Sequence, residues 1–143
     1  MANKSFSANP GLVLVITYFI LFAVNSLGLY LAHLWFPQFI VLGTASVSPA
    51  WAILNSMGIL ALLNTFAIPF VREIETKRGK MFTPKDWMIA YFGLNFVGIW
   101  LITRLAYQLG FGITSWVIAA ALAVALDIIQ GAAMMQLEKL RRS

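Results

Sequence analysis

Long apolar stretches, separated by a few polar segments, dominate the pattern along this chain. Residues 11–34, 50–71, 87–107 and 113–137 form four such stretches. About 20 apolar residues are enough to cross the hydrocarbon core of a bilayer, which is roughly 30 Å thick. The apolar residues run without the alternation of faces that a surface helix of a soluble protein shows. The pattern therefore predicts an all-α membrane protein with four transmembrane helices.

A charged segment, residues 72–86, lies between the second and third stretches and reads REIETKRGKMFTPKD. A charge at the membrane centre costs roughly 2.5–3.5 kcal/mol on insertion scales, so this segment must lie in water. Its excess of Lys and Arg predicts a cytoplasmic loop. Within it, Thr83 followed by Pro84 and Asp86 predicts the start of the third helix, with Thr83 as the N-cap.

The remaining basic residues indicate the orientation of the chain. Lys4 precedes the first stretch, basic residues follow the fourth, and only Arg104 falls toward the other side. By the positive-inside rule both termini are expected in the cytoplasm of a multi-pass plasma (inner) membrane protein. Residues 1–143 then form a single transmembrane domain. The first stretch is longer than the roughly 7–15 apolar residues of a signal peptide, so we expect it to be retained.

Residues 35–49 (WFPQFIVLGTASVSP) carry no charge, are bounded by prolines and are too short to span. We expect an extended or re-entrant segment at the outer interface; an ordinary apolar loop over the bundle is the alternative. A tight Gly-rich turn is expected at residues 108–112.

The two halves of the chain share a short pattern. Residues 25–31 (NSLGLYL) are similar to residues 95–101 (NFVGIWL), and PAW at 49–51 is similar to TSW at 114–116. This similarity predicts two similar hairpins, related by an axis along the membrane normal.

Composition narrows the range of functions. Of 143 residues, 61% are hydrophobic and 10% are charged, against roughly 25% charged in a soluble domain. The absence of cysteine excludes disulfides and thiolate metal sites, and a single histidine, His33, excludes a His-rich metal cluster. The net charge of +5 is expected to meet anionic lipids at the cytoplasmic face rather than nucleic acid. No nucleotide-binding loop, HExxH, GxSxG or carboxylate pair is present, so we expect neither enzyme activity nor a cofactor.

Six polar residues within the stretches are candidates for a functional site: Asp127, Asn64, Asn95, Arg104, Asn25 and Asn55. A rise of about 1.5 Å per residue places the first three in the inner half of the membrane and the last three in the outer half. Two polar layers are therefore expected.

Asp127 is the only acidic residue deep in a stretch. It belongs to a stripe of small residues at i, i+4 spacing (Ala119, Ala123 and Gly131), and such stripes favour close helix contact in lipid. We expect Asp127 to face protein, where Asn64 and Asn95 could donate to it. It would be either a proton- or cation-binding carboxylate or a structural hydrogen-bond anchor.

Arg104 and the asparagines have alternative interpretations. Arg104 is expected to extend outward beside Tyr107 or to bind a lipid phosphate, with a role in an ion path as the alternative. The pattern Asn-x-x-Gly begins at Asn25, Asn55 and Asn95. It favours helix packing, in which Gly permits close approach and Asn bonds across, although an Asn-lined polar path is the alternative.

The layout resembles the YvlD-type small membrane proteins that carry a phage-holin family label. The features that carry the resemblance lie between Val24 and Gly131: residues 25–31, Phe36-Pro37, residues 62–64 followed by Pro69, and residues 95–101. Ile68 stands where that family often has a basic residue, and the charged loop is longer than usual there. The resemblance implies a bacterial-type plasma-membrane protein without a cofactor, and it supplies no catalytic residues.

Three hypotheses follow. The first is a non-enzymatic membrane protein that forms homo-oligomers and is holin-like or serves the cell envelope. The second is a small ion- or proton-coupled channel or transporter that uses Asp127. The third is an accessory subunit of a larger membrane complex.

Overall fold

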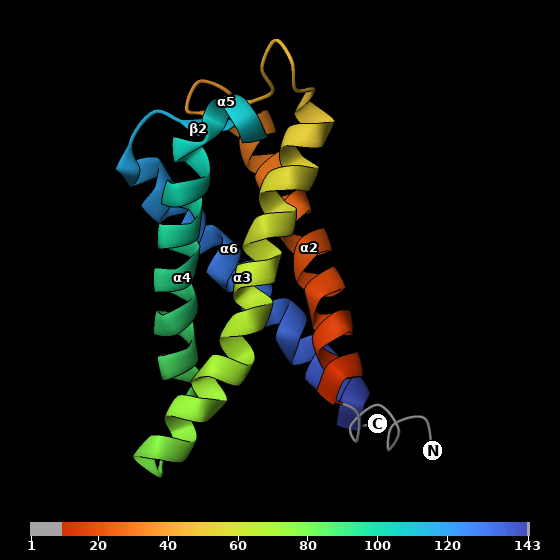
Figure 1. The fold of residues 1–143 in the computed structure, drawn as a ribbon, viewed down its shortest axis with the longest axis vertical. Coiled ribbons are helices and arrows are strands. Elements are labelled where there is room, and N and C mark those ends of the chain that lie inside the picture. Colours follow the sequence, from red (N-terminus) through yellow and green to blue (C-terminus); the bar gives the residue numbers. More distant parts are fainter. Residues whose placement is uncertain (1–9, 143) are drawn as a thin grey trace.

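The computed structural model describes the backbone of residues 10–142 and the side-chain surroundings of residues 11–136. Four long helices form a bundle: α2 (Pro10–Trp35), α3 (Pro49–Arg78), α4 (Pro84–Arg104) and α6 (Trp116–Arg142) (Figure 1). Each is long and apolar enough to cross a membrane. The prediction of an integral membrane protein with four transmembrane helices is thereby confirmed.

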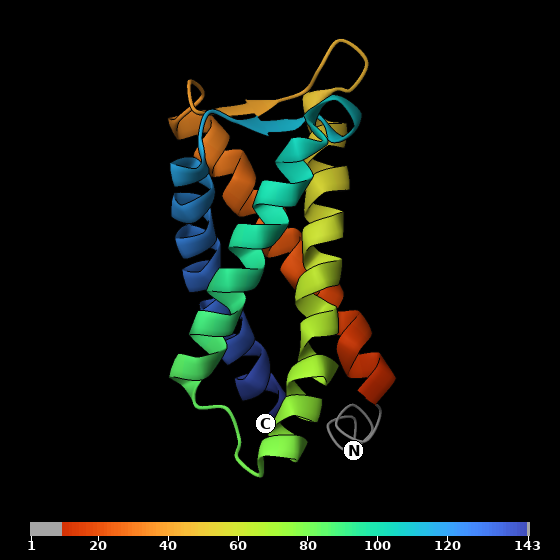
Figure 2. The same ribbon diagram turned by 60° about the vertical axis from the view of Figure 1, so that its left-hand side comes forward.

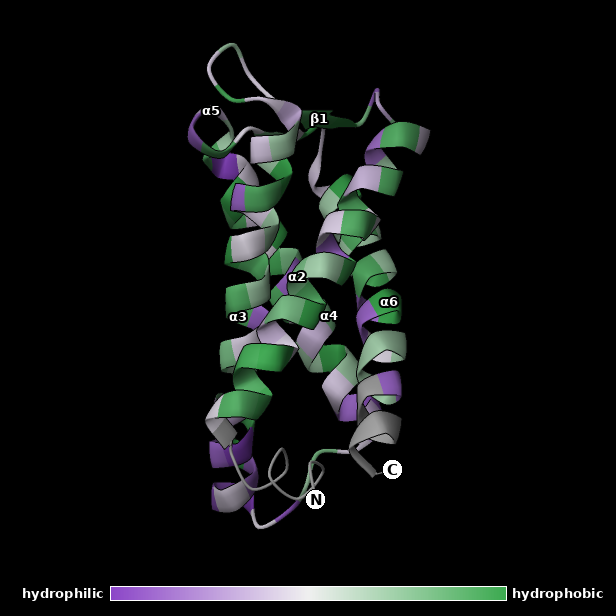
Figure 3. Cartoon of the chain, turned by 90° about the vertical axis from the view of Figure 1, so that its right-hand side faces the viewer, coloured by the Kyte–Doolittle hydropathy of each residue, from purple (hydrophilic) through white to green (hydrophobic). Residues whose placement is uncertain are grey.

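The two ends of the bundle differ. The start of α2, the end of α6 and the connection at residues 79–83 lie at one end, which we call the loop end (Figure 2). The strands β1 (Ile40–Leu42) and β2 (Phe111–Ile113) and the short helix α5 (Ala106–Leu109) lie at the other, the strand end. Hydrophobic residues predominate along the helices, whereas hydrophilic residues gather at the loop end (Figure 3).

Helix α3 extends further than the sequence pattern predicts. Its N-cap is Ser48, whose side chain accepts a hydrogen bond from the backbone nitrogen of Trp51. The helix continues through Pro69 to Arg78, where Gly79 ends it in the left-handed conformation with φ of 71°. Of the expected loop at 72–86, the first seven residues are therefore helical, and the connection to α4 is residues 79–83.

Helix α4 begins as the sequence predicts. Thr83 is the N-cap, and its hydroxyl accepts from the backbone nitrogen of Asp86, whose carboxylate accepts from the backbone nitrogen of Thr83. This capping box satisfies two backbone donors that the first turn would otherwise leave unpaired. The helix starts at Pro84, three residues before the predicted span, and ends at Arg104.

The strand end is a small antiparallel pair that closes the bundle. The expected extended segment contains β1, which pairs with β2 so that Val41 lies opposite Gly112. The predicted turn at 108–112 is shorter in the structure, because α5 continues to Leu109 and the chain is extended from Phe111. Gly110, with φ of 82°, makes the change of direction. The side chains of Ile40, Leu42 and Phe111 are buried.

The core lies between the middle of the bundle and the strand end. Helix α2 packs on α3 and on α6, and α4 packs on the same two helices. The buried apolar side chains between them include Leu29, Met57, Leu60, Ile99 and Leu126. Residues 84–94 of α4 and 131–136 of α6 include no buried residue. Residues 11–16 of α2 and 72–78 of α3 include none either, so near the loop end all four helices are less tightly packed than in the middle of the bundle.

Candidate functional site

Four side-chain amides, one from each long helix, form a closed ring of hydrogen bonds at the centre of the bundle. Asn25 of α2 donates to Asn64 of α3 at 3.2 Å, and Asn64 donates to Asn95 of α4 at 2.9 Å. Asn95 donates to Gln130 of α6 at 3.0 Å, and Gln130 donates back to Asn25 at 2.7 Å. Every member of this amide ring is thus both a donor and an acceptor.

The amide ring is shielded from the surroundings of the bundle. Its three asparagines are fully buried and Gln130 is 2% exposed. An unpaired amide in an apolar environment is costly, so in hydrocarbon these groups must find partners within the protein. Gln130 also approaches the carbonyl oxygens of Asn64 and Asn95, at 3.1 and 3.4 Å. The ring therefore ties all four helices together at one level.

The contacts around the ring come in matched pairs. Asn25 and Asn95 are 70 positions apart, and Asn64 and Gln130 are 66 positions apart. Two bonds of the ring lie within the halves of the chain (Asn25 to Asn64, and Asn95 to Gln130), and two cross between them. If Asn25 is exchanged with Asn95 and Asn64 with Gln130, the same four hydrogen bonds are obtained, with the same donors and acceptors in each half.

Two glycines beside the ring form a second matched pair. A Cβ on Gly28 would lie 2.8 Å from Cδ2 of Leu126, and a Cβ on Gly98 would lie 2.7 Å from Cδ1 of Leu60. Gly28 and Gly98 are 70 positions apart, and Leu60 and Leu126 are 66 positions apart. These close approaches between α2 and α6 and between α3 and α4 form an apolar layer next to the amides.

The bundle axis is filled with side chains from the ring to the strand end. The apolar layer of Leu60 and Leu126 is followed by the buried Met57, Ile99 and Leu29, and β1 and β2 lie across the end. All of these side chains are uncharged and neither acids nor bases. Within residues 11–136, the axis thus offers helix association but no acid–base or metal chemistry.

The structure separates Asp127 from the ring amides expected to donate to it. Asn64 donates to Asn95, Asn95 donates to Gln130, and no hydrogen bond to Asp127 occurs among the described residues. Ala119 and Ala123 in its stripe are fully buried, but Asp127 is partly exposed and Gly131 is exposed. The stripe therefore leaves the packed region at Asp127.

The expected division into two polar layers is wrong for Asn25, which lies at the level of Asn64 and Asn95. Helices α2 and α6 cross the others at an angle (Figure 1), so residue counts along separate helices do not convert into one depth scale. Asn55 is exposed on α3 and joins no polar path. The glycines of all three Asn-x-x-Gly pairs lie at helix contacts, since Gly58 faces Phe22 and Tyr18 of α2, but only Asn25 and Asn95 form hydrogen bonds across helices.

The other polar candidates lie near the strand end. Arg104 is exposed, and its guanidinium stacks over the ring of Trp100, 4.3 Å from the centroid. Nδ1 of His33 lies 2.9 Å from the backbone oxygen of Ile40, which links α2 to β1. Neither side chain contacts the amide ring, and Arg104 packs on Trp100 rather than beside Tyr107 as expected.

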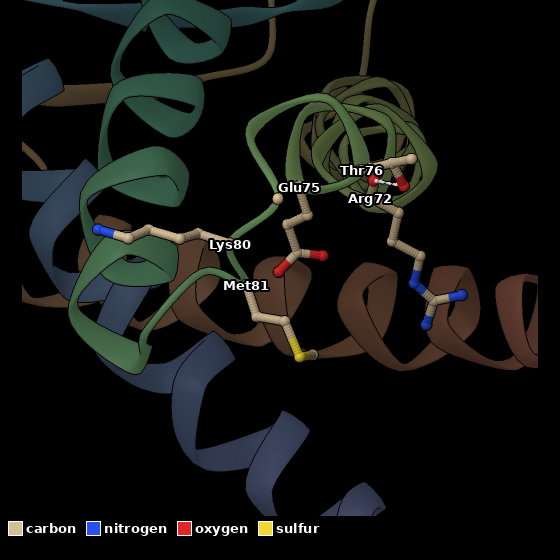
Figure 4. A pocket seen from close by; sticks show the side chains of 6 residues that line it. Arg72, Glu75, Thr76, Lys80 and Met81 are labelled. Atoms are coloured by element: carbon tan, nitrogen blue, oxygen red, sulfur yellow. Dashed lines mark hydrogen bonds between the residues drawn. The ribbon is translucent and has the colours of Figure 1, made fainter.

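A surface hollow of about 550 Å³ lies at the loop end, lined by Arg72, Glu75, Thr76, Gly79, Lys80 and Met81. Figure 4 shows that the side chains of Arg72 and Lys80 point away from each other and from Glu75. The Glu75 carboxylate accepts a hydrogen bond from the backbone nitrogen of Phe82 and so fixes the connection. The cations do not converge, so this hollow is not an anion site of defined geometry.

Gln130 is the ring member that the sequence pattern missed. On helix α6, the charged Asp127, three residues before Gln130, was chosen as the candidate site residue instead. The signal was available, because Gln130 matches Asn64 once α3 and α6 are aligned at an offset of 66 positions. One side-chain amide in each of the four apolar stretches, at matching positions in the two halves, is the pattern that predicts such a ring.

Comparison of the chain with protein-family models, curated proteins and solved structures finds no match. The resemblance to the YvlD-type group therefore depends on the residues named above, and what is established is that the chain folds as an integral membrane protein with four membrane-spanning helices.

Proposed function

We propose that this chain is a non-enzymatic, self-associating membrane protein, holin-like or serving the cell envelope. The observation that carries the proposal is the closed amide ring with the apolar layer beside it. The centre of the bundle is occupied by side chains that pair with one another, so a single chain offers no opening along its axis. A membrane opening or a larger complex would therefore form between several copies of the chain.

The proposal includes the orientation of the chain and its repeat. The basic residues of the charged segment, residues 72–86, lie at the loop end, which we place in the cytoplasm beside anionic lipids of the plasma membrane; they are Arg72, Lys77, Arg78, Lys80 and Lys85. The matched contacts of the ring and of the glycines support two similar hairpins, residues 10–78 and 84–142. The cysteine-free chain allows a direct test: Thr76→Cys should react with an impermeant thiol reagent only from the cytoplasm, and Ser46→Cys only from outside.

A second candidate function, a proton- or cation-coupled transporter, is favoured by one observation. Asp127 is a partly exposed carboxyl within the apolar part of α6, and Tyr91 of α4 donates a hydrogen bond to the backbone oxygen of Asn64 at 3.3 Å. Intramembrane ionisable residues are candidates for proton relays. Any such path would run along the face of α6 near the loop end, because the amide ring fills the axis.

Membrane potential during induced expression in a bacterium separates these functions. A sudden loss of potential that Asp127→Asn leaves unchanged would support the holin-like proposal. A graded, pH-dependent flux that Asp127→Asn abolishes would favour the transporter. If expression leaves the potential unchanged and the protein purifies with a larger membrane protein, both are replaced by an accessory role.

A further inference from the structure

The surface between the two halves of the chain is built from contacts that occur twice. Asn64 donates to Asn95, and Gln130 donates to Asn25. Leu126 packs on Gly28, and Leu60 packs on Gly98. Each half therefore presents an accepting Asn and a Gly on its first helix, and a donating amide and a Leu on its second helix.

The strand pair shows the same relationship. Val41 and Gly112 lie opposite each other at its centre, with Ile40 opposite Ile113 and Leu42 opposite Phe111. Outside the pair, the backbone nitrogen of Gly43 donates to the oxygen of Gly110 at 2.7 Å, and that of Thr114 donates to the oxygen of Phe39 at 3.2 Å. If each residue is replaced by the one 71 positions away, the first of these bonds becomes the second and the second becomes the first. A two-fold axis therefore passes between Val41 and Gly112.

An interface with two-fold symmetry is self-complementary, because the same patch serves on both sides. Here the patch of residues 10–78 meets an equivalent patch of residues 84–142. Either half of a second copy would offer the same amides, glycines and strand edge. The symmetry thus makes a second copy a chemically suitable occupant of this surface.

In the membrane, the cost of separating the halves comes from their polar contacts rather than from their apolar surfaces. Lipid tails are as apolar as the side chains, so parting two helices in a bilayer exposes nothing to water. The polar contacts between the halves are the amide hydrogen bonds from Asn64 to Asn95 and from Gln130 to Asn25 and Asn64, the hydrogen bond from Tyr91 to the backbone oxygen of Asn64, and the strand pair. The equivalent half of a second copy offers the same partners, so an exchange leaves none of these groups unpaired in hydrocarbon. The connection at residues 79–83 is short, and short hinge connections favour exchange of elements between copies.

We propose that this surface is the docking surface for a second copy: one half of the second copy takes the place of the chain's own other half. The proposal rests on the self-association proposed above and names its interface. Five extended residues reach about 17 Å, which allows α3 and α4 of one chain to enter neighbouring bundles.

The test uses full-length chains with single cysteines. Two differently tagged copies, one with Val41→Cys and one with Gly112→Cys, are expressed together and oxidised in the membrane. Opposed residues in an antiparallel pair have Cα atoms about 4.5–5.5 Å apart, which a disulfide can bridge. An exchanged assembly is expected to give covalent dimers in this mixture or in Val41→Cys alone. Intact bundles lying side by side would hold these positions at least about 20 Å apart, two helix diameters.

A peripheral control separates docking from simple association. Tyr107 is 86% exposed beside the strand end, so Tyr107→Cys reports copies that merely lie side by side. Covalent dimers through Tyr107→Cys without any through Val41→Cys or Gly112→Cys would overturn the docking surface and leave self-association standing. No dimers in any combination would overturn both.

A locked chain gives a second, independent measurement. Val41→Cys and Gly112→Cys in one chain, oxidised in dilute detergent, join the halves within that chain, because the two residues lie opposite each other in the strand pair. After reconstitution, the locked chain is expected to be monomeric by single-molecule photobleaching, while its reduced form self-associates. A locked chain that associates like the reduced one would overturn the inference.

Discussion

The side-chain amide of Asn64 donates to the carbonyl oxygen of Asn95 at 2.9 Å, and this bond joins the second transmembrane helix to the third across the boundary between the halves. It is one of the four hydrogen bonds that close the amide ring, in which each side chain donates to the next one. The ring is therefore a cooperative unit, and removing one member leaves two neighbours without their partners.

Replacement of Asn95 by Leu should destabilise the bundle by about 1–3 kcal/mol, because Asn64 loses an acceptor and Gln130 loses a donor in a buried site. Asn55→Leu is the matched control on an exposed position, and its effect should stay within about 0.5 kcal/mol. Unfolding in mixed micelles as a function of SDS measures both. Equal effects of the two substitutions would contradict an energetic role for the ring.

Replacement of Gly98 by Ala should destabilise the protein by about 1 kcal/mol, because the added Cβ meets Leu60 at 2.7 Å and the Leu side chain must move. Gly93 lies on the same helix with no heavy atom within 4 Å of the added Cβ. Gly93→Ala should therefore be neutral or stabilising, through helix propensity alone. The same unfolding measurement compares them, and a loss of stability in Gly93→Ala as large as in Gly98→Ala would refute the close approach.

Gly110 and Gly79 both have positive φ, but their surroundings differ. A Cβ on Gly110 would meet Ala52 at 2.8 Å and Val47 at 2.9 Å, whereas nothing lies within 4 Å of one on Gly79. Gly79→Ala should show only the conformational cost of about 1–2 kcal/mol. Gly110→Ala should lose more and should speed hydrogen exchange of the Gly43 amide, which donates to Gly110. Normal protection of that amide in Gly110→Ala would contradict this view of the strand end.

Removal of the Thr83 hydroxyl should weaken the start of α4. Thr83→Ala takes away a capping bond, for a loss of about 1 kcal/mol. Thr76→Ala is the control, since that hydroxyl bonds only to the Arg72 carbonyl of its own exposed helix turn. Hydrogen exchange at the Asp86 and Trp87 amides should rise several-fold in the first variant and stay constant in the second. Unchanged exchange in Thr83→Ala would show that the cap contributes little.

Local sequence signals predicted the parts of the fold that depend on local chemistry. Apolar length located the four spans, and Thr83, Pro84 and Asp86 marked the start of α4 because capping requires those residue types at that spacing. The end of α3 was missed because charged residues can continue a helix into water, and it is Gly79 that ends it. Strand β2 was missed because three residues carry no period of their own.

The site was predicted in its residue types but not in its partners. Asn25, Asn64 and Asn95 were identified as polar residues in apolar stretches, yet Asn25 was assigned to a different depth from the other two. Hydrogen-bond partners depend on how helices tilt and cross, which a residue count along one helix does not contain. Gln130 was overlooked because the charged Asp127 lies three residues before it. In the structure the neutral amide of Gln130 is buried, whereas the carboxyl of Asp127 is partly exposed.

The cyclic order of the amide ring has an electrical consequence. Each amide points its donor toward the next member, so four side-chain dipoles run head to tail around a closed loop and their moments largely cancel. A transmembrane voltage acts on net charge and on net dipole, and the ring supplies neither. The polar centre of this bundle should therefore be indifferent to the resting potential, so any voltage dependence of the protein would have to arise from Asp127 or from the charged helix ends.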